Sequence, residues 1–202
     1  MTTDNPQAAA LHSIHNLRKD VGVAIVVIVA LALGWWLRSY TLSRTTAYQD
    51  SETGFSLQFP TAWGVADTLQ DVMLKVENPT TASAYKTNLV VEARELDPQN
   101  PPTLQEFVDR RVTQKSNLTG YHFISEQDGV VDGNPARQII YAYVVQPIDQ
   151  PRRVSLPVVV VAREAIVVGK DRVYYLTVAA PEEEFATASA QLGGILKTVN
   201  IP

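Results

Sequence analysis

The sequence predicts an α+β domain with helices packed on an antiparallel sheet, preceded by one N-terminal transmembrane helix. Residues 21–37 (VGVAIVVIVALALGWWL) form an uncharged and almost wholly apolar run. Beyond it, short apolar or alternating stretches are separated by turn residues, as in strands joined by hairpins. Two amphipathic stretches, near residues 104–116 and 181–199, stand apart from the strands in the chain order. Helices segregated in this way are typical of α+β folds.

Composition excludes several classes of chemistry. The 202 residues include 17 basic and 21 acidic side chains, so the net charge is −4 and gives no electrostatic case for binding nucleic acid. The chain has no cysteine, which excludes disulfides, thiolate nucleophiles, zinc–thiolate sites and a thioether-linked lipid anchor. Attachment to a membrane must therefore come from the apolar run itself.

The apolar run is predicted to be an uncleaved membrane anchor. At about 1.5 Å per residue it covers roughly 25 Å, the short end of what a bilayer core requires. Aromatic side chains at its far end favour the interface between membrane and water. The side chains expected to contact lipid are Val21, Ile25, Ile28, Leu31, Trp35, Trp36 and Leu37. A cleaved signal peptide ending at Ala30-Leu31-Ala32 is the alternative, and it would leave Trp35 and Trp36 exposed near a new N-terminus.

Four regions follow from this anchor. Residues 1–20 are expected to be a cytoplasmic tail, 21–37 the transmembrane helix, 38–47 a polar linker, and 48–202 the folded domain. The charges that flank the run are nearly balanced, so orientation rests on the N-terminal hydrophobic signal itself. We expect a single-pass protein of the cell membrane, with the domain on the periplasmic, extracytoplasmic or lumenal side.

The first half of the domain is predicted to contain three strands and one helix. Residues 54–60, 72–76 and 88–96 have the apolar patterns of strands, and a turn-rich break follows at 97–102. Thr103 and Glu106 then match a capping box, which predicts a helix from Leu104 to about Ser116.

The second half is predicted to be hairpins followed by a helix. Strands are expected at 123–127, 136–146, 156–168 and 173–179, with turn residues at 128–129 and 132–135. Arg163 and Glu164 interrupt the third of these strands, which suggests a bulge. Pro181 is expected to start the final helix, with three glutamates in its first turn complementing the helix dipole.

Several of these segments resemble a known family. Gly54-Phe55-Ser56-Leu57-Gln58-Phe59-Pro60, followed by Trp63, is similar to the opening motif of PsbP-like domains. Asp132-Gly133-Asn134-Pro135-Ala136 resembles the family's central turn. Residues 165–185 (AIVVGKDRVYYLTVAAPEEEF) resemble its last hairpin and the entry to its closing helix, into which 195–199 also fits.

The resemblance covers roughly residues 48–201 and implies an αβα sandwich around an antiparallel sheet. PsbP-like proteins are extrinsic, non-enzymatic subunits or assembly factors on the lumenal or periplasmic side of photosynthetic membranes. Cyanobacterial members are typically anchored through a lipidated cysteine, which this sequence lacks. No ion-retaining or photosystem-contacting residue of the family matches a position here. The resemblance therefore implies docking on a membrane complex without naming that complex.

The search for catalytic, cofactor and metal motifs is negative. There is no G-x-S-x-G elbow, phosphate loop, H-E-x-x-H or G-x-G-x-x-G pattern. We therefore expect neither enzymatic activity nor a cofactor. Candidate contacts with a partner are Arg152 and Arg153, in the proline-rich segment 146–157, and Arg110 and Arg111, on the predicted solvated side of the first domain helix.

Two functions remain open from the sequence. The first is an accessory or assembly subunit that docks on a larger membrane complex, photosynthetic and electron-transfer complexes included, with the helix among lipids and other spans. The second is an exported module that binds a small apolar molecule or lipid between sheet and helix. A hydrolase with an unrecognised carboxylate pair is the weakest of the alternatives.

Overall fold

A computed structural model of the chain describes residues 23–37, 44–67, 72–97, 99, 101–146 and 156–202. The chain divides into two compact units, Met1–Arg44 and Thr45–Pro202. In the first unit, residues 23–37 form a helix. Among the described residues, no helix combines the length and the apolar character that crossing a membrane requires.

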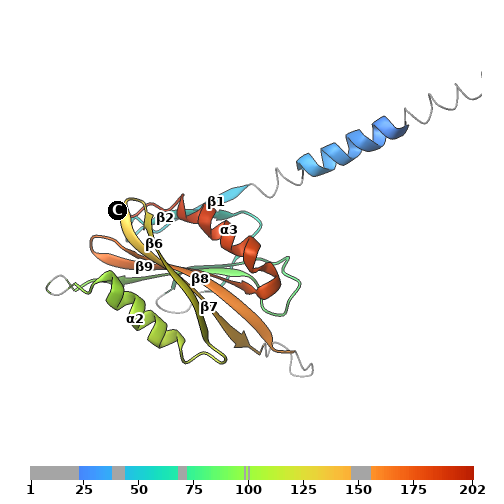
Figure 1. The fold of residues 1–202 in the computed structure, drawn as a ribbon. Coiled ribbons are helices and arrows are strands. Elements are labelled where there is room, and N and C mark those ends of the chain that lie inside the picture. Colours follow the sequence, from blue (N-terminus) through green and yellow to red (C-terminus); the bar gives the residue numbers. More distant parts are fainter. Residues whose placement is uncertain (1–22, 38–43, 68–71, 98, 100, 147–155) are drawn as a thin grey trace, which may run out of the picture. The chain divides into compact units, whose positions relative to one another are not determined.

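The second unit is built on a seven-stranded antiparallel sheet with the strand order β3-β4-β5-β9-β8-β7-β6 (Figure 1). Its strands are β3 (Gly64–Val65), β4 (Val72–Glu77), β5 (Asn88–Glu95), β6 (His122–Val131), β7 (Asn134–Val145), β8 (Val158–Val168) and β9 (Arg172–Pro181). A separate ribbon pairs β1 (Thr45–Gln49) with β2 (Ser56–Pro60). Strand β1 thus begins inside the range 38–47 that the sequence predicts to be a linker.

Two helices cover opposite faces of this sheet. They are α2 (Leu104–Lys115) and α3 (Phe185–Leu196). Side chains alternate along the central strand β9, so that Tyr174 and Leu176 face α3 whereas Val173 and Tyr175 face α2. The predicted α+β class, with helices flanking an antiparallel sheet, is confirmed.

Each face has its own hydrophobic core. On the α3 face, the β1–β2 ribbon contributes Phe55, Leu57 and Phe59, and the helix contributes Leu192 and Ile195. On the α2 face, the buried cluster includes Phe107, Val108, Ile139, Tyr141 and Ile166. Side chains therefore fill the space between the sheet and each helix.

Two local predictions are confirmed in detail. The Thr103 hydroxyl accepts a hydrogen bond from the Glu106 N–H over 3.3 Å, and the Glu106 carboxylate accepts one from the Thr103 N–H over 2.6 Å. This is the predicted capping box. Asp132 and Gly133 form a two-residue turn between β6 and β7, with φ values of 50° and 75°. Positive φ at both positions is what such a hairpin requires. Asp128 and Gly129, also predicted to be turn residues, instead lie within β6 and pair with β7.

The predicted bulge at Arg163 and Glu164 is wrong. Strand β8 pairs with β7 and β9 in an unbroken register. Its two charged residues point to opposite faces, where each finds partners. The Arg163 guanidinium donates to the Ser189 hydroxyl and carbonyl of α3, each over 3.0 Å, and Glu164 faces α2. Because both groups are satisfied in regular strand geometry, no extra residue is needed.

The predicted start of the last helix is confirmed in part, because Pro181 is the N-cap of the helical segment and the three glutamates form its first turn. Pro181 is the final residue of β9, where it pairs with Val160. A 3-10 helix, η1 (Glu182–Glu184), then precedes α3. The Glu184 carboxylate accepts hydrogen bonds from the hydroxyls of Thr81 and Thr87, over 2.9 and 2.6 Å. This glutamate therefore ties the segment before β5 to the start of α3.

Candidate functional site

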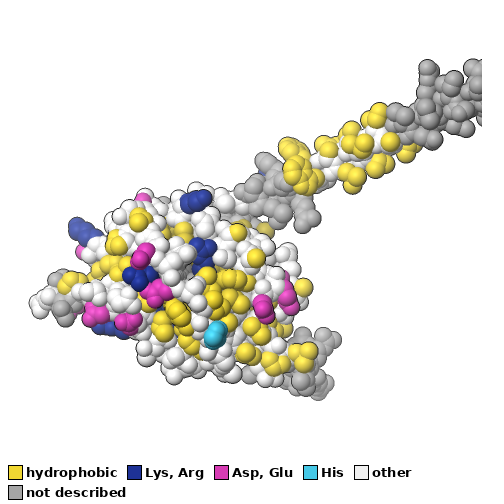
Figure 2. Space-filling view, in the orientation of Figure 1, with side chains coloured by type: hydrophobic (Ala, Val, Ile, Leu, Met, Phe, Trp, Pro, Cys, Tyr) yellow, Lys and Arg dark blue, Asp and Glu magenta, His cyan; other side chains and the backbone are white. Residues whose placement is uncertain are grey.

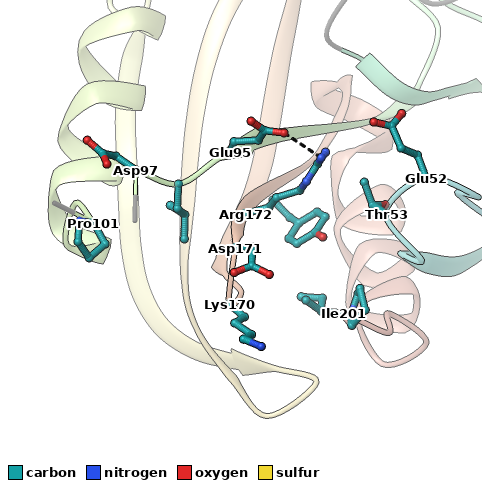
Figure 3. Close-up of a pocket in the computed structure, with 12 residues that line it drawn as sticks. Glu52, Thr53, Glu95, Asp97, Pro101, Lys170, Asp171, Arg172 and Ile201 are labelled. Atoms are coloured by element: carbon teal, nitrogen blue, oxygen red, sulfur yellow. Dashed lines mark hydrogen bonds and ion pairs between the residues drawn. The ribbon is translucent and has the colours of Figure 1, made fainter. Parts of the chain in front are cut away.

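A wide cleft of about 750 Å³ opens where the ends of several strands meet (Figure 3). We call it the strand-end cleft. Its walls come from the β1–β2 turn, the end of β5, the β8–β9 turn and the C-terminus. The lining residues are Glu52, Thr53, Glu95, Leu96, Asp97, Pro101, Lys170, Asp171, Arg172, Tyr174, Ile201 and Pro202.

Local hydrogen bonds fix the walls of the cleft. One carboxylate oxygen of Asp50 accepts the N–H and the hydroxyl of Thr53, over 2.7 and 2.6 Å, and closes the β1–β2 turn. These bonds lower the pKa of Asp50 below its usual value. At the C-terminus, the Ile201 N–H donates to Asp132 over 2.8 Å. The segment that ends the chain is thereby held against the β6–β7 hairpin.

The cleft presents charges of both signs. Arg172 forms an ion pair with Glu95, with Nη2 and Oε1 3.0 Å apart (Figure 3). Within the described part of the chain, Lys170 and Glu52 form no ion pair. The described residues also contain no group of three or more His, Asp or Glu side chains placed to hold a metal ion. An open cleft with mixed charges is suited to ion pairing with a polar partner.

Beneath α2 lies a buried ionic network centred on Arg111. Its Nε donates to Glu164 over 2.5 Å, and its Nη2 donates to Glu92 over 2.7 Å. Nη1 donates to Glu92 and to Gln114, over 3.1 and 3.0 Å. The Tyr141 hydroxyl adds a longer contact of 3.3 Å to Glu164. The network joins α2 to β5, β7 and β8.

The network explains the shifted pKa values of its members. Burial would lower the pKa of Arg111, but the carboxylates of Glu164 and Glu92 outweigh burial and raise it, so the guanidinium stays charged. Burial would raise the pKa of Glu92, but the hydrogen bonds and charge of Arg111 leave it lowered. For Lys115, burial and the nearby Arg111 charge lower the pKa. The buried charges are therefore largely neutralised by one another.

The expectation that Arg111 lies on the solvated side of its helix is wrong. Its side chain is 3% exposed and shares a stripe of α2 with Phe107 and Val108. The reason is Glu164, a fully buried carboxylate that needs a cation opposite it. Arg110, one position earlier, is exposed as expected.

The other predicted site residues lie elsewhere or outside the described part of the chain. Arg152 and Arg153 fall outside the described residues, as does Val21. The remaining predicted anchor residues all belong to the helix at 23–37, where every one is exposed: Ile25, Ile28, Leu31, Trp35, Trp36 and Leu37. Their role as an anchor remains a prediction.

Sequence reasoning missed Glu92, Glu164 and Arg172 as members of these sites. Glu164 carries a signal that could have found the network, because a carboxylate inside an apolar strand requires a buried partner. The strand-end cleft has no comparable signal, since its walls come from four segments far apart in the chain.

The fold is shared with solved structures at low sequence identity. The solution structure of cyanobacterial PsbP (CyanoP) from Synechocystis sp. PCC 6803 matches with a TM-score of 0.58 and 12% identity, over 78% of this chain and 92% of that chain. The domain has the PsbP-like fold. The family resemblance of the sequence is thus confirmed at the level of the fold.

Two further solved structures with this fold come from other bacteria. LpqN of Mycobacterium tuberculosis, described as involved in cell envelope biogenesis, matches with a TM-score of 0.57 and 12% identity, over 79% of this chain and 91% of that chain. A Pseudomonas aeruginosa protein of unknown function, described as a putative regulator, matches with a TM-score of 0.50 and 16% identity, over 79% and 98%. In sequence, no family model and no curated protein matches the chain.

Proposed function

We propose that this protein is a non-enzymatic accessory or assembly subunit, tethered to a membrane, whose PsbP-like domain docks on a larger membrane complex outside the cytoplasm. The observation that carries the proposal is the surface of the helix at 23–37. Apolar side chains cover the face of this helix that Figure 2 shows. The exposed apolar residues include the five consecutive positions from Ile25 to Val29, which point to all sides of a helix, and Leu31 and Trp35 are 68% and 72% exposed. A helix that is apolar on every side is typical of a segment surrounded by lipid or by other helices.

The length of the apolar run supports the tether. In the sequence the run begins at Val21, before the described helix, and ends at Leu37. Its roughly 25 Å is the short end of a bilayer core. The fold shared with LpqN supports a role in the cell envelope. The mixed charges of the strand-end cleft support docking through ion pairs with partner subunits.

Membrane fractionation tests the tether. The full chain is expressed in a bacterium, and the membranes are washed with carbonate at alkaline pH. We expect the wild type to remain with the membrane and the variant Ile28→Lys, Leu31→Lys to be released, because two charges at the centre of the run are costly in hydrocarbon. The variant Val130→Lys, Leu156→Lys is the control, since these apolar residues are exposed on the domain. Recovery of the wild type in the soluble fraction would overturn the tether.

Purification in mild detergent from native membranes tests the docking. We expect other membrane subunits to co-purify with the full chain, and raised salt to weaken the association if ion pairs carry it. The variant Arg152→Ala, Arg153→Ala tests the predicted contact segment, and unchanged co-purification at every salt concentration would remove that segment from the interface. Recovery of the protein alone, under conditions that keep known complexes intact, would overturn docking.

One observation favours the second candidate function, an exported module that binds an apolar molecule. A groove of about 380 Å³ runs between the β1–β2 ribbon and β3–β4. Tyr48, Phe59, Val65, Met73 and Leu74 supply its apolar lining. Native mass spectrometry of the purified chain separates the two functions, because a retained apolar ligand supports this one.

A further inference from the structure

A second, smaller cleft lies on the α2 face, between α2 and the end of β5. We call it the arginine cleft. It measures about 370 Å³, and the lining residues that matter here are Arg94, Asp97, Phe107, Arg110, Arg111 and Tyr175. It is distinct from the strand-end cleft, although Glu95 and Asp97 line both.

Arg111 lines the cleft, and most of its donors are already used by other side chains. Its nitrogens donate to Glu164, Glu92 and Gln114, as described above. Its Cζ lies 4.7 Å from the centroid of the Tyr175 ring. Four of its five N–H groups are therefore used within the protein, and its guanidinium face holds the Tyr175 ring in place.

Arg94 and Arg110, unlike Arg111, have side chains without a hydrogen-bonded partner among the described residues. Both are exposed, and neither guanidinium makes a hydrogen bond or an ion pair with any residue that the structure describes. Arg94 lies on β5, with Cζ 6.0 Å from the centroid of the same Tyr175 ring. Arg110 lies on α2. Two elements therefore bring two unpaired guanidinium groups to one cleft.

No carboxylate near the cleft forms an ion pair with Arg94 or Arg110 among the described residues. Glu95 is bound to Arg172. Asp97 accepts the Gln99 N–H over 2.9 Å through one oxygen and stands at the rim. The Glu106 carboxylate accepts a hydrogen bond from the N–H of the cap residue Thr103. Hydrogen bonds from Thr103 lower the pKa of Glu106, and the positive charge of Arg110 helps to lower it further.

We infer that the arginine cleft binds an oxyanion, a carboxylate or a phosphate, between Arg94 and Arg110. Guanidinium groups offer planar, paired donors that match the oxygens of these anions. The volume is at the small end of ligand sites, which suits one small anion or one acidic side chain of a partner. The inference is independent of the membrane tether.

The test is a titration of the full chain in detergent, labelled with ¹⁵N-arginine and followed by NMR of the Nε–H groups. The probes are citrate, inorganic phosphate and an amidated peptide of alternating Asp and Glu. We expect the signals of Arg94 and Arg110, assigned from single Arg→Gln variants, to shift and saturate. Saturation with citrate or phosphate assigns the site to a free anion, and saturation with the peptide alone assigns it to a partner's acidic side chain. If no probe shifts these signals, the inference is overturned.

Variants separate the geometry of the site from general charge. Calorimetric titration with the probe that saturates the wild type compares the variants, because a variant without Arg94 and Arg110 lacks their NMR signals. We expect the variant Arg94→Lys, Arg110→Lys to bind about tenfold more weakly, because lysine keeps the charge but loses the planar pair of donors. The variant Lys75→Gln, Lys197→Gln removes two positive charges elsewhere and should bind like the wild type. The variant Asp97→Asn should bind more tightly, since it removes a negative charge at the rim. If Lys75→Gln, Lys197→Gln weakens binding as much as Arg94→Lys, Arg110→Lys does, the inference is overturned.

Discussion

The Nε atom of Arg111 lies 2.5 Å from Oε1 of Glu164, and both side chains are withdrawn from water. Glu164 is 0% exposed and Arg111 is 3% exposed. Each charge is tolerated in the interior because the other is present, and Glu92 completes the network from β5. The pair also links the middle of α2 to a central strand of the sheet.

Removal of one member of this pair should therefore be costly. We expect Arg111→Ala to lower the free energy of unfolding by about 3–5 kcal/mol, since it leaves the Glu164 carboxylate buried without a partner. Urea unfolding of the full chain, followed by circular dichroism, measures the change.

The neighbouring residue provides the matched control. Arg110→Ala should change the free energy of unfolding by no more than about 0.5 kcal/mol, because Arg110 is exposed and makes no ion pair with the described residues. Similar losses in the two variants would contradict the assigned burial of Arg111.

Glu92 should make stability depend on pH in the acid range. Because Arg111 holds its folded-state pKa below the ordinary 4.5, its contribution is fully present above that value and is lost as the pH falls through the lower folded pKa. We expect Glu92→Gln to lose less stability than the wild type between about pH 5 and pH 3. Urea unfolding at a series of pH values measures both slopes.

A neutral variant in the same network checks this interpretation. Gln114→Ala removes a hydrogen-bond partner of Arg111 but no titrating group, so it should keep the pH slope of the wild type. If the stability of Glu92→Gln depended on pH as steeply as that of the wild type, Glu92 would not be the source of the acid dependence.

The capping box predicts a measurable effect at an exposed position. Thr103→Ala removes the hydroxyl that accepts the Glu106 N–H at the start of α2, and it should cost about 1 kcal/mol of stability. Thr113→Ala, in the exposed interior of the same helix, should stay within about 0.5 kcal/mol of the wild type. Equal effects of the two substitutions would argue against a stabilising cap.

Two glycines should respond in opposite directions to alanine. Gly194 lies inside α3, and an added Cβ would meet nothing within 4 Å, so Gly194→Ala should stabilise the protein by about 0.5–1 kcal/mol. Gly133 has a φ of +75°, so Gly133→Ala should destabilise it by about 1–2 kcal/mol. Thermal unfolding compares the two, and a loss of stability in Gly194→Ala would contradict the prediction.

The elements that the sequence predicts best are those specified by neighbouring residues. Thr103 and Glu106 are three positions apart, and Asp132 and Gly133 are adjacent, so local chemistry determines both the cap and the turn. Short apolar stretches between turn residues likewise predict most strands and the α+β class. Strands β8 and β9 are almost continuously apolar because the sheet has one core on each face.

The candidate sites depend on contacts that are distant in sequence. Arg111 and Glu164 are separated by 53 residues, and no local pattern pairs them. The spacing of Phe107, Val108 and Arg111 places all three on one stripe of α2. An arginine on the apolar stripe of a helix and a carboxylate inside an apolar strand together predict a buried ion pair. These two features were the sequence signal for the network. Neither cleft could be predicted, because each is assembled by the packing of separate segments.

The opposite orientations of Arg163 and Glu164 have a consequence for how β8 enters the sheet. A slip of this strand by one residue would exchange its two faces. Arg163 would then confront Arg111, and Glu164 would confront the Ser189 carbonyl that Arg163 now binds. Two positive charges would then meet on the α2 face, and two hydrogen-bond acceptors would meet on the α3 face. The shifted register is therefore destabilised on both faces of the sheet. These two consecutive charged residues therefore fix the register of β8. Its many valines would otherwise fit almost equally well in either of the two registers.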